Sequence, residues 1–386
     1  MKVLTQTLVL TRLSFLGIAR RKWSALVLVA SVACVIGVLL SMLSVTAGML
    51  RAYRSGEDPQ QALVLAPDRT NEWGNGIPPN AVGTILDAPG IAKRADGHPL
   101  GDAEVLIWVP PTGAYVIGAP NLRGIGPAGL ELRPNVRIIA GRPFRSGRHE
   151  VIVGIAAARA FELKVGDPVL LSGGRWPIVG EFADEGSMLE SEMLTDADTL
   201  VADGQAQGYA SIHVKLQSPA AFATFARWLE TNPNLGESAE RQSDYARRTA
   251  HENSAFFTAL AYLVAAMMAL GAVFGTVKLM YAAVSTRTRE LATLRAIGYQ
   301  PVPLALSVLM EAIALALLGA LIGAAVAALA FNGRHVVQAR NVFDLAITWP
   351  LVRLGIAWAL ALALLGGLPP ALRSARLSVT AALRAL

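Results

Sequence analysis

The chain has 386 residues, of which 53% are hydrophobic and only 16% are charged, and its net charge is +6. This charged fraction lies below the quarter that is usual for soluble domains, so the composition excludes an ordinary soluble protein. The surplus Lys and Arg residues flank apolar runs instead of clustering on one folded domain, so the basic balance does not indicate nucleic-acid binding.

The N-terminal region predicts an interfacial helix followed by a membrane crossing. Residues 1–23 combine apolar side chains with Lys and Arg, which is typical of an amphipathic helix on a bilayer surface. The uncharged run 23–50 exceeds the roughly 20 residues that a helix needs to cross the membrane. It is also much longer than the roughly 7–15-residue apolar core of a signal peptide, so we expect an anchor that is not cleaved.

Residues 51–252 form a polar insert that holds nearly all the Asp and Glu residues of the chain. Short runs rich in Val, Ile and Trp alternate with Gly and Pro clusters, which predicts strands. Helices are expected at Ile155–Leu163 and Pro219–Thr231. The pattern predicts an α+β domain with two subdomains. Charged helical segments at Arg51–Glu57 and Ser238–Glu252 would continue the adjacent crossings outward as a stalk.

Three further uncharged runs follow the insert, at 253–277, 312–333 and 354–372. Basic residues lie before the first run of the chain, after the second and after the fourth, and short cationic flanks stay on the cytoplasmic side. We therefore expect both termini and the segment between the second and third crossings in the cytoplasm. The insert would then lie on the other side of the membrane, outside the cytoplasm.

The predicted fold class is an integral α-helical membrane protein with four transmembrane helices and a large α+β periplasmic domain between the first two. The expected segments are an interfacial helix (1–23), the first crossing (24–50), the periplasmic domain with stalk ends (51–252), the second crossing (253–283), a cytoplasmic coupling segment (284–303), the third crossing (304–332), a periplasmic loop (333–349), the fourth crossing (350–369) and a cytoplasmic tail (370–386).

The sequence contains no convincing catalytic or cofactor-binding motif. The five histidines lack the spacing of metal ligands, and there is no Gly-x-x-x-x-Gly-Lys-Ser/Thr loop for nucleotide phosphates. The acid-rich stretch Asp184–Asp198 lacks the order of a calcium loop and predicts a solvated surface. We therefore expect no catalytic residue, metal or cofactor in this chain.

The cytoplasmic segment between the second and third crossings carries the most specific pattern. Leu291, Leu294 and Ile297 recur at helical spacing, and Gly298 and two following prolines end the helix. A positively charged loop alone needs no apolar stripe, whereas such a helix suits docking into the groove of another protein. The predicted contact residues are Arg287, Arg289, Glu290, Leu291, Leu294, Arg295, Ile297 and Gly298.

Three residues of the third crossing are candidates for transmembrane packing or dimer contacts. Glu311 lies early in the crossing, where a carboxylate in lipid would cost several kcal/mol. It either bonds to a neighbouring helix or lies near the interface in water. Gly319 and Gly323 form a small-xxx-small pair that permits close helix approach, although glycine is also a common background residue in apolar helices.

The run Arg289–Gly298 resembles the signature of FtsX-like, MacB-type permeases of ABC transporters, and Leu309–Ala312 and Leu317–Gly323 continue it. In the insert, Gly141–Phe144 and Glu150–Gly154 are similar to the periplasmic core domain of that family. The resemblance extends over most of the chain.

The resemblance implies a permease without ATPase activity of its own. Two permeases, identical or related, would each receive one copy of an ABC ATPase at the contact residues, and ATP and Mg would bind to that ATPase. The periplasmic domains would then move and drive export or extraction of a lipophilic or peptide-like substrate. An export complex would also include a periplasmic adaptor, and membrane lipid would surround the helices.

Two other functions fit the same architecture. FtsX-type relatives act as transmembrane signal relays that control a periplasmic cell-wall hydrolase. A membrane anchor that displays a binding domain without any ATPase is the second alternative. The size of the insert and its two expected subdomains favour the transporter.

Overall fold

The structure is a computed structural model. It describes residues 6–7, 9–12, 22–54, 58–67, 69–74, 76–109, 120–171, 174–232, 235–286, 288–297, 299–338 and 341–375. The predicted interfacial helix (1–23) and cytoplasmic tail (370–386) lie mostly outside these residues. The chain divides into two compact units. We call them the helical unit (residues 1–47, 255–332 and 346–386) and the sheet unit (residues 48–254 and 333–345).

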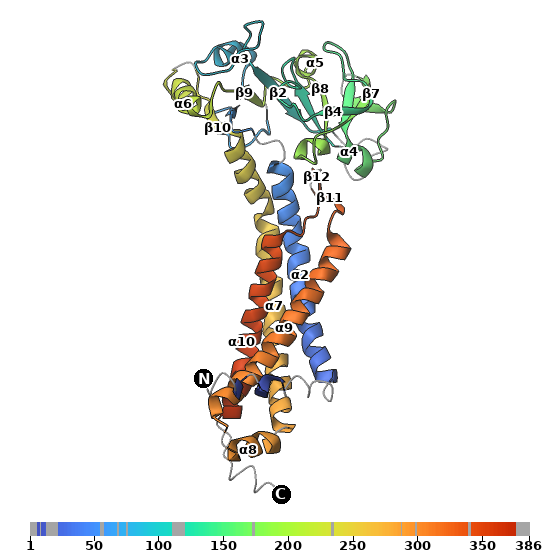
Figure 1. The fold of residues 1–386 in the computed structure, drawn as a ribbon. Coiled ribbons are helices and arrows are strands. Elements are labelled where there is room, and N and C mark those ends of the chain that lie inside the picture. The colour runs from blue at the N-terminus through green and yellow to red at the C-terminus, as the bar shows by residue number, and fades with distance from the viewer. Residues whose placement is uncertain are drawn as a thin grey trace. The chain divides into compact units, whose positions relative to one another are not determined.

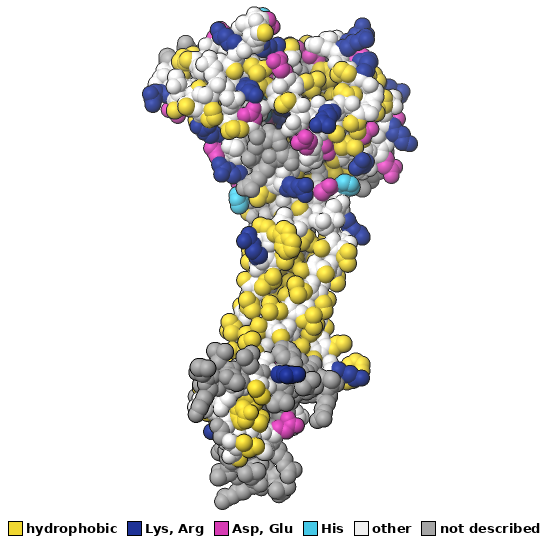
Figure 2. All heavy atoms as spheres, in the orientation of Figure 1, with side chains coloured by type: hydrophobic (Ala, Val, Ile, Leu, Met, Phe, Trp, Pro, Cys, Tyr) yellow, Lys and Arg dark blue, Asp and Glu magenta, His cyan; other side chains and the backbone are white. Residues whose placement is uncertain are grey.

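Four helices are long enough and apolar enough to cross a membrane. They are α2 (Lys22–Arg54), α7 (Gln242–Thr286), α9 (Pro301–Phe331) and α10 (Trp349–Ala375), and the short helix α8 (Thr288–Ala296) lies between α7 and α9 in the sequence. The four long helices run side by side as a bundle (Figure 1), and hydrophobic side chains gather over its outer surface (Figure 2). The predicted fold class is confirmed.

The helical unit packs through small and branched apolar side chains. Its largest core cluster joins Leu28, Val32 and Ile36 of α2 to alanines of α9 and α10. Lipid tails are as apolar as leucine, so close van der Waals contact between small residues holds such helices together. Helix α7 is the least covered of the four: 22% of its most apolar stretch is buried, against 44% for α9.

The sheet unit contains one mixed sheet of ten strands in the order β10-β1-β9-β2-β3-β8-β5-β7-β4, with β6 paired to β7. The strands are β1 (Gln61–Leu65), β2 (Gly101–Ile107), β3 (Asn121–Ile125), β4 (Arg137–Gly141), β5 (Val151–Gly154), β6 (Pro168–Leu171), β7 (Gly174–Ala183), β8 (Glu192–Asp196), β9 (Ser211–Lys215) and β10 (Ser238–Arg241). The pairs β3–β8 and β5–β7 are parallel, and the other described pairs are antiparallel.

Helices cover this sheet at two places and create two hydrophobic cores. The helices are α3 (Pro79–Leu86), α4 (Ile155–Ala160), α5 (Ala197–Ala202) and α6 (Phe222–Thr231), with short 3₁₀ turns at η2 (Met188–Ser191) and η3 (Pro219–Ala221). One core joins Ile85 and Phe225 to β1 and β9. The other joins Leu200 and Trp176 to β5 and β8. One continuous sheet therefore carries both of these cores within a single compact unit, and the division into two subdomains stays a prediction.

Two segments differ from the elements expected from sequence. Ser238–Arg241 was expected to be helical but forms strand β10, because its backbone pairs with β1; α7 begins only at Gln242. The expected loop 333–349 contains a hairpin of β11 (His335–Gln338) and β12 (Asn341–Asp344). This hairpin contacts α4 and η2 and belongs to the sheet unit. Its strands are too short for a clear periodic pattern.

Candidate functional site

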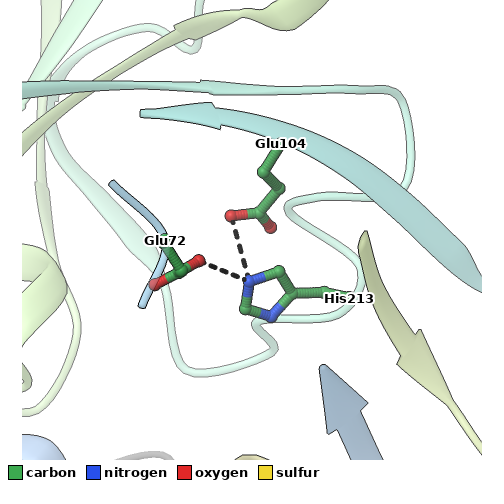
Figure 3. Close-up of side chains that lie close together, drawn as sticks. All are labelled: Glu72, Glu104 and His213. Atoms are coloured by element: carbon green, nitrogen blue, oxygen red, sulfur yellow. Dashed lines mark hydrogen bonds and ion pairs between the residues drawn. The ribbon is translucent and has the colours of Figure 1, made fainter. Parts of the chain in front are cut away.

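Five ionisable side chains meet inside the sheet unit, and we call them the Arg123 cluster. Arg123 on β3 donates from Nε to Glu192 Oε2 on β8 at 2.6 Å. Its Nη1 lies 2.8 Å from Glu72 Oε1, in the loop before α3, and 2.8 Å from Glu104 Oε2 on β2. His213 Nε2, on β9, lies 3.1 Å from Glu72 and 3.4 Å from Glu104. The two carboxylates point toward that ring nitrogen (Figure 3).

Strand register brings the cluster together. Arg123 lies opposite Leu106 on β2, and Glu104 stands two residues from Leu106, so both charged side chains leave the same face of the sheet. On β9, Ser211 and His213 also alternate onto one face, and the Ser211 hydroxyl donates to Glu72 at 2.8 Å. The cluster is therefore a cross-strand network that no single strand contains.

The charges of the cluster stabilise one another against the cost of burial. Burial alone would raise the pKa of Glu72, but Arg123 and the hydrogen bond with His213 outweigh it and hold that pKa well below its ordinary range. Burial likewise would lower the pKa of Arg123, yet Glu192, Glu72 and Glu104 raise it well above the ordinary value. The Arg123 guanidinium and the Glu72 and Glu104 carboxylates remain ionised at neutral pH.

The arrangement does not fit a resident metal ion. Glu72, Glu104 and His213 offer ligand atoms that all lie within 4.8 Å of one another. However, Arg123 Nη1 already lies within hydrogen-bond distance of both carboxylates. The guanidinium thus holds the position between the two glutamates that a cation would take. The expectation of no metal stays a prediction for the chain as a whole.

Sequence reasoning missed this cluster because its members are far apart in the chain. The signal that could have found it is a charge in the middle of an otherwise apolar strand, as at Glu104 and Arg123. Such a residue must find a partner when the strand is buried on both faces.

The prediction of a solvated surface at Asp184–Asp198 was wrong. Asp184, Glu190, Glu192 and Asp196 are all buried. Glu190 Oε1 accepts hydrogen bonds from the backbone amides of Asp184 and Gly186 at 2.6 and 3.0 Å. Asp196 caps α5 through the amide of Thr199 at 3.0 Å. Glu190 therefore stabilises a turn, Asp196 caps a helix and Glu192 belongs to the Arg123 cluster, which composition alone does not reveal.

The Arg123 cluster lies in the wall of an open cavity of about 610 Å³. This volume is within the roughly 300–1,000 Å³ that is usual for small-molecule sites. Besides Arg123, Glu72 and His213, the wall includes Tyr53 from the end of α2 and Tyr245 from the first turn of α7. The last turn of α2 and the first turn of α7 therefore line the same cavity as the strands.

The predicted cytoplasmic contact residues lie on and around α8. Leu294 packs in a cluster with Val284 of α7, Leu304 of α9 and Ala371 of α10, so it serves the internal packing of the helical unit. Arg295 donates from Nη1 to the carbonyl of Ala375, and α8 lies at the end of the bundle where α10 ends (Figure 1).

The outer side of α8 is formed by other residues. Glu290 and Thr293 are exposed, and Ile297, in the turn after the helix, is 72% exposed. Arg287 and Gly298 lie outside the described residues, as do the side chains of Arg289 and Leu291. Among the residues whose side chains are described, Ile297 is the exposed apolar member of the predicted stripe.

The three candidates in the third crossing all face the interior of the helical unit. Glu311 is 6% exposed and borders a small cavity beside Ser24 of α2 and Met280 of α7. A methyl group on Gly319 would come within 2.7 Å of the Val29 carbonyl oxygen of α2, and one on Gly323 within 2.4 Å of the Ala33 carbonyl oxygen. The two glycines therefore allow α9 to approach α2 of the same chain.

Comparison with known families assigns this architecture. A model of the MacB-like periplasmic core domain matches residues 24–232, which is more than half of the chain. The chain belongs to the MacB-type permease family. A model of the FtsX-like permease C-terminal region matches residues 262–379 of this MacB-type permease, so the two matches together include all or part of each of the four long helices. The resemblance stated from the motifs is confirmed.

The remaining comparisons add little to that assignment. The chain is similar to a crystal structure of the extracellular domain of the noncanonic ABC-type transporter YknZ from Gram-positive bacteria, with 15% identity and a TM-score of 0.34. That match covers 47% of this chain and 98% of the YknZ domain. A search of curated proteins found no matching relative. The MacB-type permease is thus a membrane subunit of an ABC transporter, a family that works with a partner ATPase.

Proposed function

We propose that this permease couples ATP hydrolysis by a separate ABC ATPase to movement of its periplasmic domain, and that this movement drives export or extraction of a lipophilic or peptide-like substrate. The observation that carries the proposal is the continuity of α7. This single helix has 45 residues, from Gln242 to Thr286, which corresponds to about 65–70 Å. Its first turns belong to the sheet unit, and its last turn leads directly into α8.

A hydrogen-bonded helix can transmit a displacement along its length without a polar path through the lipid. Tyr245, near the start of α7, donates to the Glu72 carboxylate of the Arg123 cluster at 3.4 Å. Val284, near the end of α7, packs with Leu294 of α8. A force applied to α8 would therefore reach the wall of the periplasmic cavity along one continuous helix.

The contact with the ATPase is assigned to the exposed side of α8, in the cytoplasm. The basic flanks of the crossings support this orientation. Ile297, with 72% of its surface exposed, can enter an apolar groove of the ATPase, and Glu290 and Thr293 lie beside it as polar contacts. Two ATPase copies would serve a pair of permeases.

The contact with a second permease is assigned to α7. Leu263, Met267 and Phe274 are 60%, 67% and 73% exposed. On the same helix, a methyl group on Gly271 or Gly275 would meet no atom within 4 Å. These glycines are spaced as a small-xxx-small pair and face open space among the described residues, so they leave room for the close approach of a helix from another copy.

The test is substitution of Ile297 in the tagged full-length permease, purified from membranes of its own host. Ile297→Asp places a charge in the docking surface, so the ABC ATPase should be lost from the purified complex while the permease still inserts into the membrane. Ile139→Asp is the matched control, because Ile139 lies on β4 in the sheet unit and is 50% exposed. Leu294→Asp is less suitable since Leu294 packs internally.

ATPase recovery at the wild-type ratio in both Ile297→Asp and Glu290→Lys would overturn the coupling assignment. Loss of the ATPase in Ile297→Asp but not in Ile139→Asp would support it. Recovery of a periplasmic cell-wall hydrolase with the intact complex would replace transport by the FtsX-type relay.

A further inference from the structure

Three residues in the wall of the cavity of about 610 Å³ carry an oxygen atom that has no hydrogen-bond partner among the described residues. The atoms are Asn121 Oδ1, Gln242 Oε1 and Thr249 Oγ1, and all three are shielded from solvent. Asn121 is only 2% exposed. Unpaired buried polar atoms are uncommon in folded proteins, so three of them around one cavity point to a missing hydrogen-bond donor.

The charges around the same cavity favour a cation. Asp58 is paired with Lys215 at 2.9 Å, and Glu252 is paired with Arg248 at 3.3 Å. The charges that remain to be compared are those of the Arg123 cluster and of its neighbour Arg133. Their carboxylates are Glu72, Glu104 and Glu192, and their guanidiniums are Arg123 and Arg133. Asp184 also lines the cavity, so the carboxyl groups outnumber the basic groups Arg123, Arg133 and His213 by four to three.

We propose that this cavity binds a small organic cation with N–H donors, a primary ammonium or a guanidinium group. Such a ligand supplies the missing positive charge and, at the same time, donors for the unpaired oxygens. No basic group among the described residues bonds to the unpaired oxygens of Asn121, Gln242 and Thr249. A bare metal ion fits less well, because Arg123 already lies between the carboxylates and the cavity is far larger than an ion.

The position of the cavity gives this binding a consequence for the long helices. Gln242 and Thr249 lie on α7, two turns apart, whereas Asn121 lies on β3 of the sheet. A cation that bonds to both elements would bind α7 more firmly to the sheet. The binding itself does not depend on coupling to an ATPase, so it can be tested with the permease alone.

The experiment is equilibrium titration of the full-length permease in detergent, without ATPase. Two probes distinguish the source of the ammonium: spermidine represents a free polyamine, and an acetylated, amidated Gly-Lys-Gly peptide represents a lysine side chain of a polypeptide. Saturable binding of either is expected. Gln242→Met and Thr249→Val keep the side-chain volume but remove the oxygen, so each should weaken binding about tenfold.

Gln338→Met is the matched control. Gln338 on β11 also carries an oxygen without a partner among the described residues, but it does not line the cavity. Binding should be unchanged in this variant. The proposal is overturned if neither probe binds saturably, if Gln242→Met and Thr249→Val bind as well as the wild type, or if Mg²⁺ at matched ionic strength displaces the probe completely. Loss of binding in both cavity variants with retention in Gln338→Met supports it.

Discussion

The helical unit and the sheet unit satisfy their buried polar groups in different ways. In the helical unit the hydroxyls of Ser44, Ser307 and Ser374 each donate to a carbonyl three residues earlier in the same helix, at 2.7, 2.9 and 2.7 Å. In the sheet unit Arg123 finds its carboxylate partners on other segments, up to 69 positions away. These three hydroxyls are thus satisfied within their own helices, whereas the Arg123 cluster is satisfied across the fold.

The difference follows from the surroundings of the two units. No water is available in the core of a bilayer, so a polar side chain on a crossing helix must form a hydrogen bond within its own helix before the helices associate. The helices then associate through small residues, as Gly319 and Gly323 do with α2. A soluble domain can leave charges in water until it folds, and it buries them only where several strands supply partners. Substitutions should therefore have non-local effects in the sheet unit and steric effects in the helical unit.

The largest effect is expected from Arg123→Met. This variant leaves Glu72, Glu104 and Glu192 buried without their shared cation, which should lower the free energy of unfolding by about 3–5 kcal/mol. The loss is measured by thermal unfolding of the full-length protein in detergent, with limited proteolysis of the sheet unit as the readout of unfolding. Arg137→Met is the control, because Arg137 is 76% exposed in its pair with Glu185. Equal effects of the two variants would contradict a buried network.

A somewhat smaller effect is expected in the helical unit from Gly323→Leu. The Cβ atom would lie 2.4 Å from the Ala33 carbonyl oxygen, so α9 must move away from α2 at a cost of about 3 kcal/mol. Resistance of the purified protein to unfolding by harsher detergent measures the change. Gly83→Leu on α3 is the control, since a Cβ at Gly83 would meet no atom within 4 Å and Gly83 lies outside the proposed contact between permeases. A stable Gly323→Leu variant would show that α2 and α9 are not closely packed.

The smallest of the three effects concerns pH and a carboxyl beside the Arg123 cluster. Burial, followed by the charge of Glu104, raises the pKa of Asp102 to about 7. The folded state therefore binds a proton that the unfolded state has lost, and the contribution of Asp102 to stability falls as pH rises from about 4 to about 7. Between pH 5 and pH 7 the loss is about 2 kcal/mol.

Asp102→Asn should remove this part of the pH dependence. Unfolding curves at pH 5, 6 and 7 provide the measurement, and the variant should be closest to the wild type at pH 5. Asp87→Asn, at an exposed position, is the control. A wild-type slope in Asp102→Asn would mean that another group binds the proton.

Much of the fold could be read from local patterns. The four crossings are visible because length and the absence of charge suffice to define a helix in lipid. The helices at Ile155 and Phe222 follow from short-range signals such as the proline at the start of η3. The permease family was recognisable from the run that ends at Gly298, since the motif is contiguous in the chain.

The candidate sites were less predictable than the fold. Spacing indicated that Leu294 and Ile297 share one apolar stripe, but the packing of α8 against three neighbouring helices separates Leu294 from the exposed surface. The spacing of Gly319 and Gly323 indicated close packing without naming the partner helix. No sequence pattern predicted the contact between Glu72 and His213, because 141 positions separate them in the chain.

The sequence by itself determined which segments are long and apolar enough to cross a membrane, that a polar insert follows the first of them, and which family the chain resembles. Each of these depends on residues that are neighbours in the chain. Only the tertiary structure decided which glycine meets which helix, which charge lies beside which carboxylate, and that α7 and β3 border one cavity. These depend on strand register and helix contact, which bring together residues that are distant in sequence and whose partners no local pattern specifies.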